Sequence, residues 1–127
     1  MLTTIVAAIL VLGLLVFVHE LGHFVVAKRS KIRVEQFSLG FPPKMIGKKV
    51  GETEYCISWL PLGGYVKIAG QADFGEAEIK GEPWEFTSKS VPTRIAVIAA
   101  GPVMNFLLAF LIFSVLALGW GIPAYDT

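Results

Sequence analysis

Two histidines four residues apart, with a glutamate directly after the first, are the residues of this chain best suited to chemistry. They form an HExxH motif, His19-Glu20-Leu21-Gly22-His23, which holds both histidines of the sequence. On a helix, residues four apart share a face, so the two imidazoles can bind one metal ion. The glutamate then lies close enough to hold a water molecule without being a ligand. The motif predicts a zinc hydrolase site, with His19 and His23 as metal ligands and Glu20 as the general base.

The motif lies near the end of an apolar run, residues 2–27, that predicts a membrane-spanning helix. A bilayer core of about 30 Å requires about 20 residues, which the run exceeds. A chance match to HExxH is the alternative, but a carboxylate at membrane depth costs roughly 2.5–3.5 kcal/mol, which disfavours a Glu20 without a function. Within the run, Gly13 and Gly22 would let another backbone approach closely.

A second apolar run, residues 95–120, predicts another membrane helix and contains Pro102 and Asn105. All 11 Lys and Arg residues lie between the two runs, so the middle of the chain is expected in the cytoplasm and both termini outside it. The predicted fold class is a mainly α membrane protein with two transmembrane helices and a small β-hairpin or re-entrant β-loop. Its expected parts are a first transmembrane helix, a cytoplasm-facing β-loop region, a second transmembrane helix and an extracytoplasmic tail, at residues 1–27, 28–94, 95–120 and 121–127.

The segment between the runs alternates apolar and polar residues and predicts short strands. Residues 32–41 are expected to form one strand, which the two prolines that follow would end. Residues 53–60 and 65–69 are expected to pair as a hairpin around the Pro-Leu-Gly-Gly stretch 61–64. Residues 71–90 are acidic and predict a solvated loop with its carboxylates at the surface. The single cysteine, Cys56, is expected to be a packed strand residue.

Three stretches resemble the site-2 protease family of intramembrane zinc metalloproteases: residues 17–24, which contain HExxH, 59–67 (WLPLGGYVK) and 101–105 (GPVMN). The resemblance implies that the second is a re-entrant β-loop that binds an unwound substrate by strand addition, with Gly63, Gly64 and Tyr65 at the substrate. The alternative is an ordinary cytoplasmic hairpin. The third implies that Asn105 helps to hold the substrate or the loop, while packing between helices is the alternative.

The resemblance implies a Zn²⁺-dependent endopeptidase of the bacterial inner membrane that cuts transmembrane segments in regulated intramembrane proteolysis. Substrates of this kind include a membrane-anchored anti-sigma factor or a remnant signal peptide. The basic residues follow from topology, so no nucleic acid partner is expected beside the lipid bilayer.

The family's third zinc ligand is an aspartate of a later transmembrane helix, and no such stretch is present in the sequence. Asp126 follows the second span and is expected outside the membrane. Family members of this kind also carry PDZ domains after the second helix. We therefore expect an N-terminal part of a longer protease, inactive alone. The alternative is a non-catalytic membrane module that captures transmembrane segments or pairs with a partner that completes the site.

Overall fold

A computed structural model describes residues 1–72 and 78–121 of the chain. Two long helices lie at the two ends of the chain, and two strands and one 3-10 turn lie between them. These elements are α1 (Leu2–Arg29), β1 (Val34–Val50), β2 (Thr53–Ile68), η1 (Phe86–Ser88) and α2 (Val91–Trp120). The predicted class, two apolar helices with an antiparallel hairpin between them, is confirmed. Most of the predicted tail, including Asp126, lies outside the described residues.

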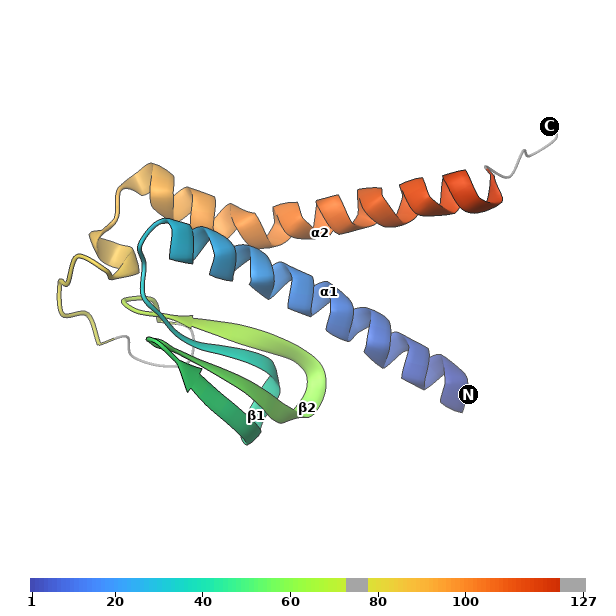
Figure 1. Cartoon of the computed structure of the whole chain (residues 1–127), viewed down its shortest axis with the longest axis horizontal. Coiled ribbons are helices and arrows are strands. Elements are labelled where there is room, and N and C mark those ends of the chain that lie inside the picture. Colours follow the sequence, from blue (N-terminus) through green and yellow to red (C-terminus); the bar gives the residue numbers. More distant parts are fainter. Residues whose placement is uncertain (73–77, 122–127) are drawn as a thin grey trace.

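The two helices run antiparallel and diverge from one end of the molecule as a V (Figure 1). They come closest near Gly22 of α1, where an added Cβ would lie 2.4 Å from the carbonyl oxygen of Ala100 in α2. No side chain fits at that distance, so Gly22 sets how closely the helices pack, as predicted. At Gly13 an added Cβ would make only ordinary contact, 3.7 Å from the carbonyl oxygen of Pro61.

Both helices are long and apolar enough to cross a membrane. In the apolar 18-residue stretch of each helix, none of the α1 residues and 11% of the α2 residues are buried. Large side chains such as Phe106 and Leu118 are 77% and 90% exposed. The core helix of a soluble domain would bury such residues, so these surfaces suit lipid surroundings.

β1 and β2 form a hairpin that folds back on itself. The first part of β1, residues 34–39, pairs on one side with residues 54–57 and on the other with residues 64–68. The second part, residues 44–50, pairs with the start of β2 across the turn at Gly51 and Glu52. The predicted pairing of residues 53–60 with residues 65–69 is therefore wrong, because the first part of β1 lies between them.

The prediction that Pro42 and Pro43 end the strand is also wrong. Their peptide bond is cis, and β1 continues through them to Val50. The pairing register shifts between Phe41 and Lys44, so the missing proline N–H groups fall where the strand bends rather than inside a ladder. Because of this fold-back, residues 64–68 form an edge strand in the described part of the chain.

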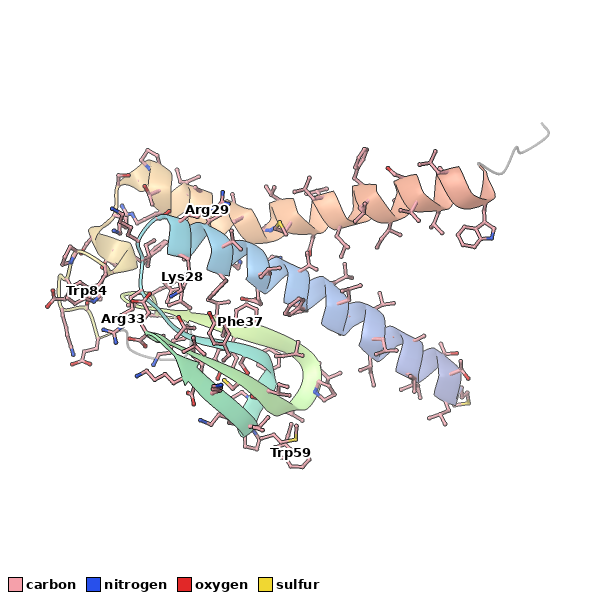
Figure 2. All side chains as sticks on the ribbon, in the orientation of Figure 1. Lys28, Arg29, Arg33, Phe37, Trp59 and Trp84 are labelled. Carbon is pink, nitrogen blue, oxygen red and sulfur yellow. The ribbon has the colours of Figure 1, made fainter. Side chains whose placement is uncertain are left out.

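A small apolar cluster joins the sheet to the ends of the helices. Its buried members are Ala27, Ile32, Val34, Val66, Ile68 and Val97. Phe37 lies between the sheet and α1 (Figure 2) and meets the ring of Phe24 edge-to-face at 5.2 Å. The basic residues Lys28, Arg29 and Arg33 lie at this same end of the molecule (Figure 2). The cluster therefore fixes the sheet against the basic end of α1.

The bend of β2 reaches much further along α1. An added Cβ on Gly63 would lie 3.5 Å from Cγ1 of Val16, and the carbonyl oxygen of Pro61 lies near Gly13. At 1.5 Å per residue, this part of α1 is roughly 20 Å from Arg29. The bend is thus level with the middle of the helix.

The acidic loop is anchored by one of its own carboxylates. Glu85 is only 3% exposed and accepts hydrogen bonds from the backbone N–H groups of Lys80 (2.9 Å) and Gly81 (3.0 Å). The prediction of surface carboxylates is therefore wrong for Glu85, whose buried charge is satisfied by backbone donors. It holds for the exposed Glu78, while Asp73 and Glu76 lie outside the described residues.

Candidate active site

A cavity of about 580 Å³ lies where α1, α2 and the end of β2 meet. Five of the predicted site residues line it: His19, Glu20 and His23 from α1, and Gly64 and Tyr65 from β2. Further lining residues are Phe41, Val66, Ile68, Gln71, Val97, Ile98 and Pro102. The fold thus brings the HExxH motif and the edge strand to one space, although they are far apart in the sequence.

The two imidazoles pack side by side against α2 at Gly101. The ring centroids of His19 and His23 are 4.8 Å apart. An added Cβ on Gly101 would lie 2.6 Å from Nε2 of His19 and 2.4 Å from Nε2 of His23. Only a residue without a side chain leaves this space open. Since zinc binds histidine nitrogen at about 2.0–2.1 Å, the two Nε2 atoms suit ligands of one ion.

The neutral His23 ring is held in the tautomer that metal binding requires. Its Nδ1 lies 2.7 Å from the backbone carbonyl oxygen of Val97. A carbonyl only accepts, so Nδ1 carries the hydrogen and donates it, and Nε2 keeps its lone pair for a metal. Metal-binding histidines usually have such an outer partner.

Asn105 and Gly63 do not line the cavity. Nδ2 of Asn105 lies 3.3 Å from Nδ1 of His19, on the side of the ring away from Nε2. Gly63 lies at the bend, where an added Cβ would meet the Phe41 ring at 2.8 Å. The predicted contacts of these two residues with substrate stay predictions.

The residues present fit two positions of a catalytic zinc site. Such a site uses three protein ligands and leaves one position for water. Residues 1–72 and 78–121 contain no group of three or more His, Cys, Asp or Glu side chains placed to hold a metal. His19 and His23 could therefore supply two nitrogen ligands, and the described residues place no third such side chain with them.

The edge strand packs closely against its neighbour. An added Cβ on Gly64 would lie 2.5 Å from the backbone oxygen of Ser38, so a side chain at this position would push the strands apart.

Burial is the main cause that raises the pKa of Tyr65, so this phenol stays protonated at neutral pH and can donate a hydrogen bond.

Sequence reasoning missed Gly101 and the Val97 carbonyl. Gly101 lies within the stretch that resembles the site-2 proteases, but nothing in its type says that it faces the histidines. The Val97 carbonyl could not be found from residue types, because every residue has one.

A helix-held HExxH motif that converges on one metal position defines the metallopeptidase class of site. Comparisons with known proteins agree. Residues 7–125 match peptidase family M50. The chain therefore belongs to peptidase family M50, the site-2 protease family, as the resemblance predicted.

Similar proteins in several bacteria carry the name "Putative zinc metalloprotease". One from Clostridium acetobutylicum is 43% identical over 118 residues, which cover 93% of this chain and 33% of that protein. One from Vibrio cholerae is 46% identical over 126 residues, covering 94% of this chain and 26% of that protein. One from Chlamydia pneumoniae is 46% identical over 123 residues, covering 91% and 20%. The chain thus spans a third or less of these relatives.

Proposed function

We propose that this chain is the HExxH-bearing part of an intramembrane zinc metalloendopeptidase that cuts transmembrane segments of other membrane proteins. The observation that carries the proposal is that His19, Glu20 and His23 line one cavity together with the edge strand. Membership of a metalloprotease family and the names of the relatives support it.

The chain's own residues would divide the chemistry as follows. His19 and His23 would hold the zinc ion, which when bound would supply an activated water molecule and a charge that polarises the scissile carbonyl. Glu20 lines the same cavity and takes the proton of the attacking water. It then passes that proton to the leaving amine, which restores the carboxylate for the next cycle.

The edge strand would hold the substrate. A peptide bond inside a helix cannot be cut until its carbonyl and amide leave the helix ladder, so the unwound stretch needs substitute hydrogen bonds. Residues 64–68 pair with β1 on one side, and Gly64, Tyr65 and Val66 line the cavity with the HExxH motif. A substrate strand added at this edge would lie across the motif.

The exposed apolar helices and the charged residues between them support a location in a membrane and one orientation in it. We propose a multi-pass protein of the bacterial inner membrane, with the basic end of α1 in the cytoplasm and both ends of this chain on the other side. The bend of β2, level with the middle of α1 and packed against it on one side, then enters the bilayer as a re-entrant loop. Its substrates would be single-span proteins such as a membrane-anchored anti-sigma factor or a remnant signal peptide.

The third zinc ligand would come from a segment outside this chain, so the 127-residue chain alone is expected to be inactive. An immunoblot of source-cell membranes, with an antibody against residues 78–90, tests this. The proposal expects a band several times heavier than 13.8 kDa. A band near 13.8 kDa would mean that a partner protein must complete the site.

The catalytic proposal is tested by Glu20→Gln in the protein as it occurs in its own membrane. Cleavage of a single-span reporter should fall by about 10²–10⁴-fold, because the general base is lost. Photo-crosslinking of the reporter to residues near Tyr65 should persist, since capture does not need the carboxylate. Glu78→Gln, at an exposed position, serves as the matched control.

Unchanged cleavage by Glu20→Gln would contradict the proposal. If the unmodified protein captures the reporter but never cuts it, the result favours the alternative function, a non-catalytic module that binds transmembrane segments.

A further inference from the structure

Asn105 is a polar side chain in an otherwise apolar part of α2, and its side-chain contact is with a metal ligand. Its Nδ2 lies 3.3 Å from Nδ1 of His19. Its Oδ1 is buried and has no hydrogen-bond partner among the described residues. A buried amide in a membrane helix is costly unless it is paired, so this contact calls for a role.

The two orientations of the amide have opposite consequences for His19. With Nδ2 toward the ring, the amide donates to Nδ1, and the neutral ring then carries its hydrogen on Nε2. That hydrogen would fill the space beside Gly101. With the amide turned over, Oδ1 accepts a hydrogen bond from Nδ1–H, and the Nε2 lone pair faces the metal position. Oxygen and nitrogen of an amide are exchanged by this simple turn.

The number of hydrogen bonds does not distinguish the two orientations of the Asn105 amide, because each leaves one end of the amide unpaired. The need for both histidines to bind one metal ion does distinguish them. His23 already has Nδ1–H donated to the Val97 carbonyl, which leaves the lone pair of its neutral ring on Nε2. A metal needs a lone pair from both rings, so His19 must adopt the same tautomer, and Asn105 is the group that contacts its Nδ1.

We propose that Asn105 is a positioning residue, which accepts the Nδ1 hydrogen of His19 through Oδ1 and so fixes the tautomer that presents Nε2 to the metal. The inference deepens the proposed function and rests on it for the identity of the ion. It makes α2 the outer support of both ligands: a backbone carbonyl holds His23, and a side-chain amide holds His19.

Three variants of α2 separate this role from simple packing. Asn105→Asp keeps an oxygen acceptor and removes the NH₂ donor. Asn105→Leu keeps a similar size and removes the acceptor. Ser114→Ala removes the other polar side chain of the apolar part of the helix, and serves as the control.

The first readout is the tautomer of each ring, by nitrogen NMR of the metal-free 127-residue chain in nanodiscs with ¹⁵N-labelled histidine. The chain has two histidines, so assignment needs only one His→Gln variant. We expect Nδ1–H in both rings of the unmodified chain. In Asn105→Leu the His19 ring should shift toward Nε2–H while His23 stays unchanged, and Asn105→Asp should keep Nδ1–H in both. An Nε2–H tautomer of His19 in the unmodified chain would overturn the proposal.

The second readout is zinc affinity, measured by competition with a chelator. Loss of an outer partner typically weakens metal binding by about 10–100-fold, which we expect for Asn105→Leu. Asn105→Asp and Ser114→Ala should stay close to the unmodified chain. Equal losses in the Leu and Asp variants would reduce Asn105 to a packing residue and contradict the inference.

The two readouts keep this inference separate from the proposed function. The tautomers are read without metal or cleavage, so they can support Asn105 even if zinc does not bind and the protease proposal fails. Conversely, a chain that binds zinc through both histidines with His19 as the Nε2–H tautomer before binding would leave the protease proposal intact and overturn this one.

Discussion

At the scale of single residues, the site depends on the missing side chain of Gly101 as much as on the side chains of the two histidines. Both Nε2 atoms lie within 2.6 Å of the position that a Cβ of residue 101 would occupy. Gly101 is therefore expected to be the least replaceable residue of α2. Its absence of a side chain lets the His19 and His23 rings pack directly against this helix.

Gly101→Ala should lower zinc affinity by more than about 10²-fold, because the new methyl group lies closer to both nitrogens than carbon and nitrogen can approach. The helix itself should not suffer, since alanine is favoured over glycine by about 1 kcal/mol in a helix. Zinc affinity is measured by chelator competition. Gly119→Ala is the matched control in the same helix, because an added Cβ there meets nothing within 4 Å. Zinc binding by Gly101→Ala at the affinity of that control would contradict the assigned packing of both histidines against Gly101.

Some residues of the site could be predicted from the sequence and others could not. The spacing of His19 and His23 fixes their common face through helix geometry alone, so this pair was predictable. Gly101 and the Val97 carbonyl act through the contact between α1 and α2, which no spacing within one helix determines. Asn105 was predicted to approach the site, but its partner, His19 Nδ1, depends on the crossing of the helices.

At the scale of elements, the crossing of α1 and α2 is set by Gly22. An added Cβ would lie 2.4 Å from the Ala100 carbonyl oxygen and 2.8 Å from the Met104 side chain. Gly22→Ala should therefore force the helices apart and destabilise the fold by roughly 1–3 kcal/mol, the usual cost of overpacking. Unfolding of the chain in mixed micelles, followed by circular dichroism, measures this. Gly13→Ala in the same helix should be nearly neutral, and equal effects at both glycines would contradict the assigned crossing point.

The acidic loop provides a second element-scale test. The Glu85 carboxylate accepts hydrogen bonds from the N–H groups of Lys80 and Gly81, and bonds to a charged group contribute about 1.5–3 kcal/mol. Glu85→Ala should speed hydrogen exchange at these two amides by about 10-fold or more, while Glu78→Ala, at an exposed position, should not. Unchanged exchange in Glu85→Ala would show that the loop is held by other contacts.

Sequence patterns predicted the strands of the sheet but not which strands pair. Residues 53–60 and 65–69 were predicted as strands and are strands, but they pair with opposite sides of residues 34–39 rather than with each other. A Gly-Gly stretch between two strand patterns favours a hairpin, and nothing local shows that another strand will insert. Such insertion depends on the fold-back at Pro42 and Pro43, a tertiary feature.

At the scale of the whole molecule, the account requires the bend of β2 to lie inside the bilayer. In a Cys56→Ala background, Glu52→Cys should react quickly with a water-soluble maleimide, because Glu52 pairs with Lys28 at the basic end of α1. Leu62→Cys should react far more slowly, although Leu62 is 51% exposed in the protein alone, because the bend lies beside the middle of α1. Labelling of intact membranes measures both. Equal rates would place the bend in water and contradict the re-entrant loop.

We infer that His19 and His23 together hold one zinc ion. X-ray absorption at the zinc edge, on the 127-residue chain in nanodiscs with one equivalent of zinc, measures the ligands of that ion. We expect two imidazole nitrogens at about 2.0–2.1 Å with oxygen in the remaining positions, and loss of the imidazole signal in the His19→Ala/His23→Ala variant. Weak binding is also expected, because the described residues place no third His, Cys, Asp or Glu with His19 and His23. Zinc held at nanomolar affinity, or an unchanged spectrum in the double variant, would contradict the account.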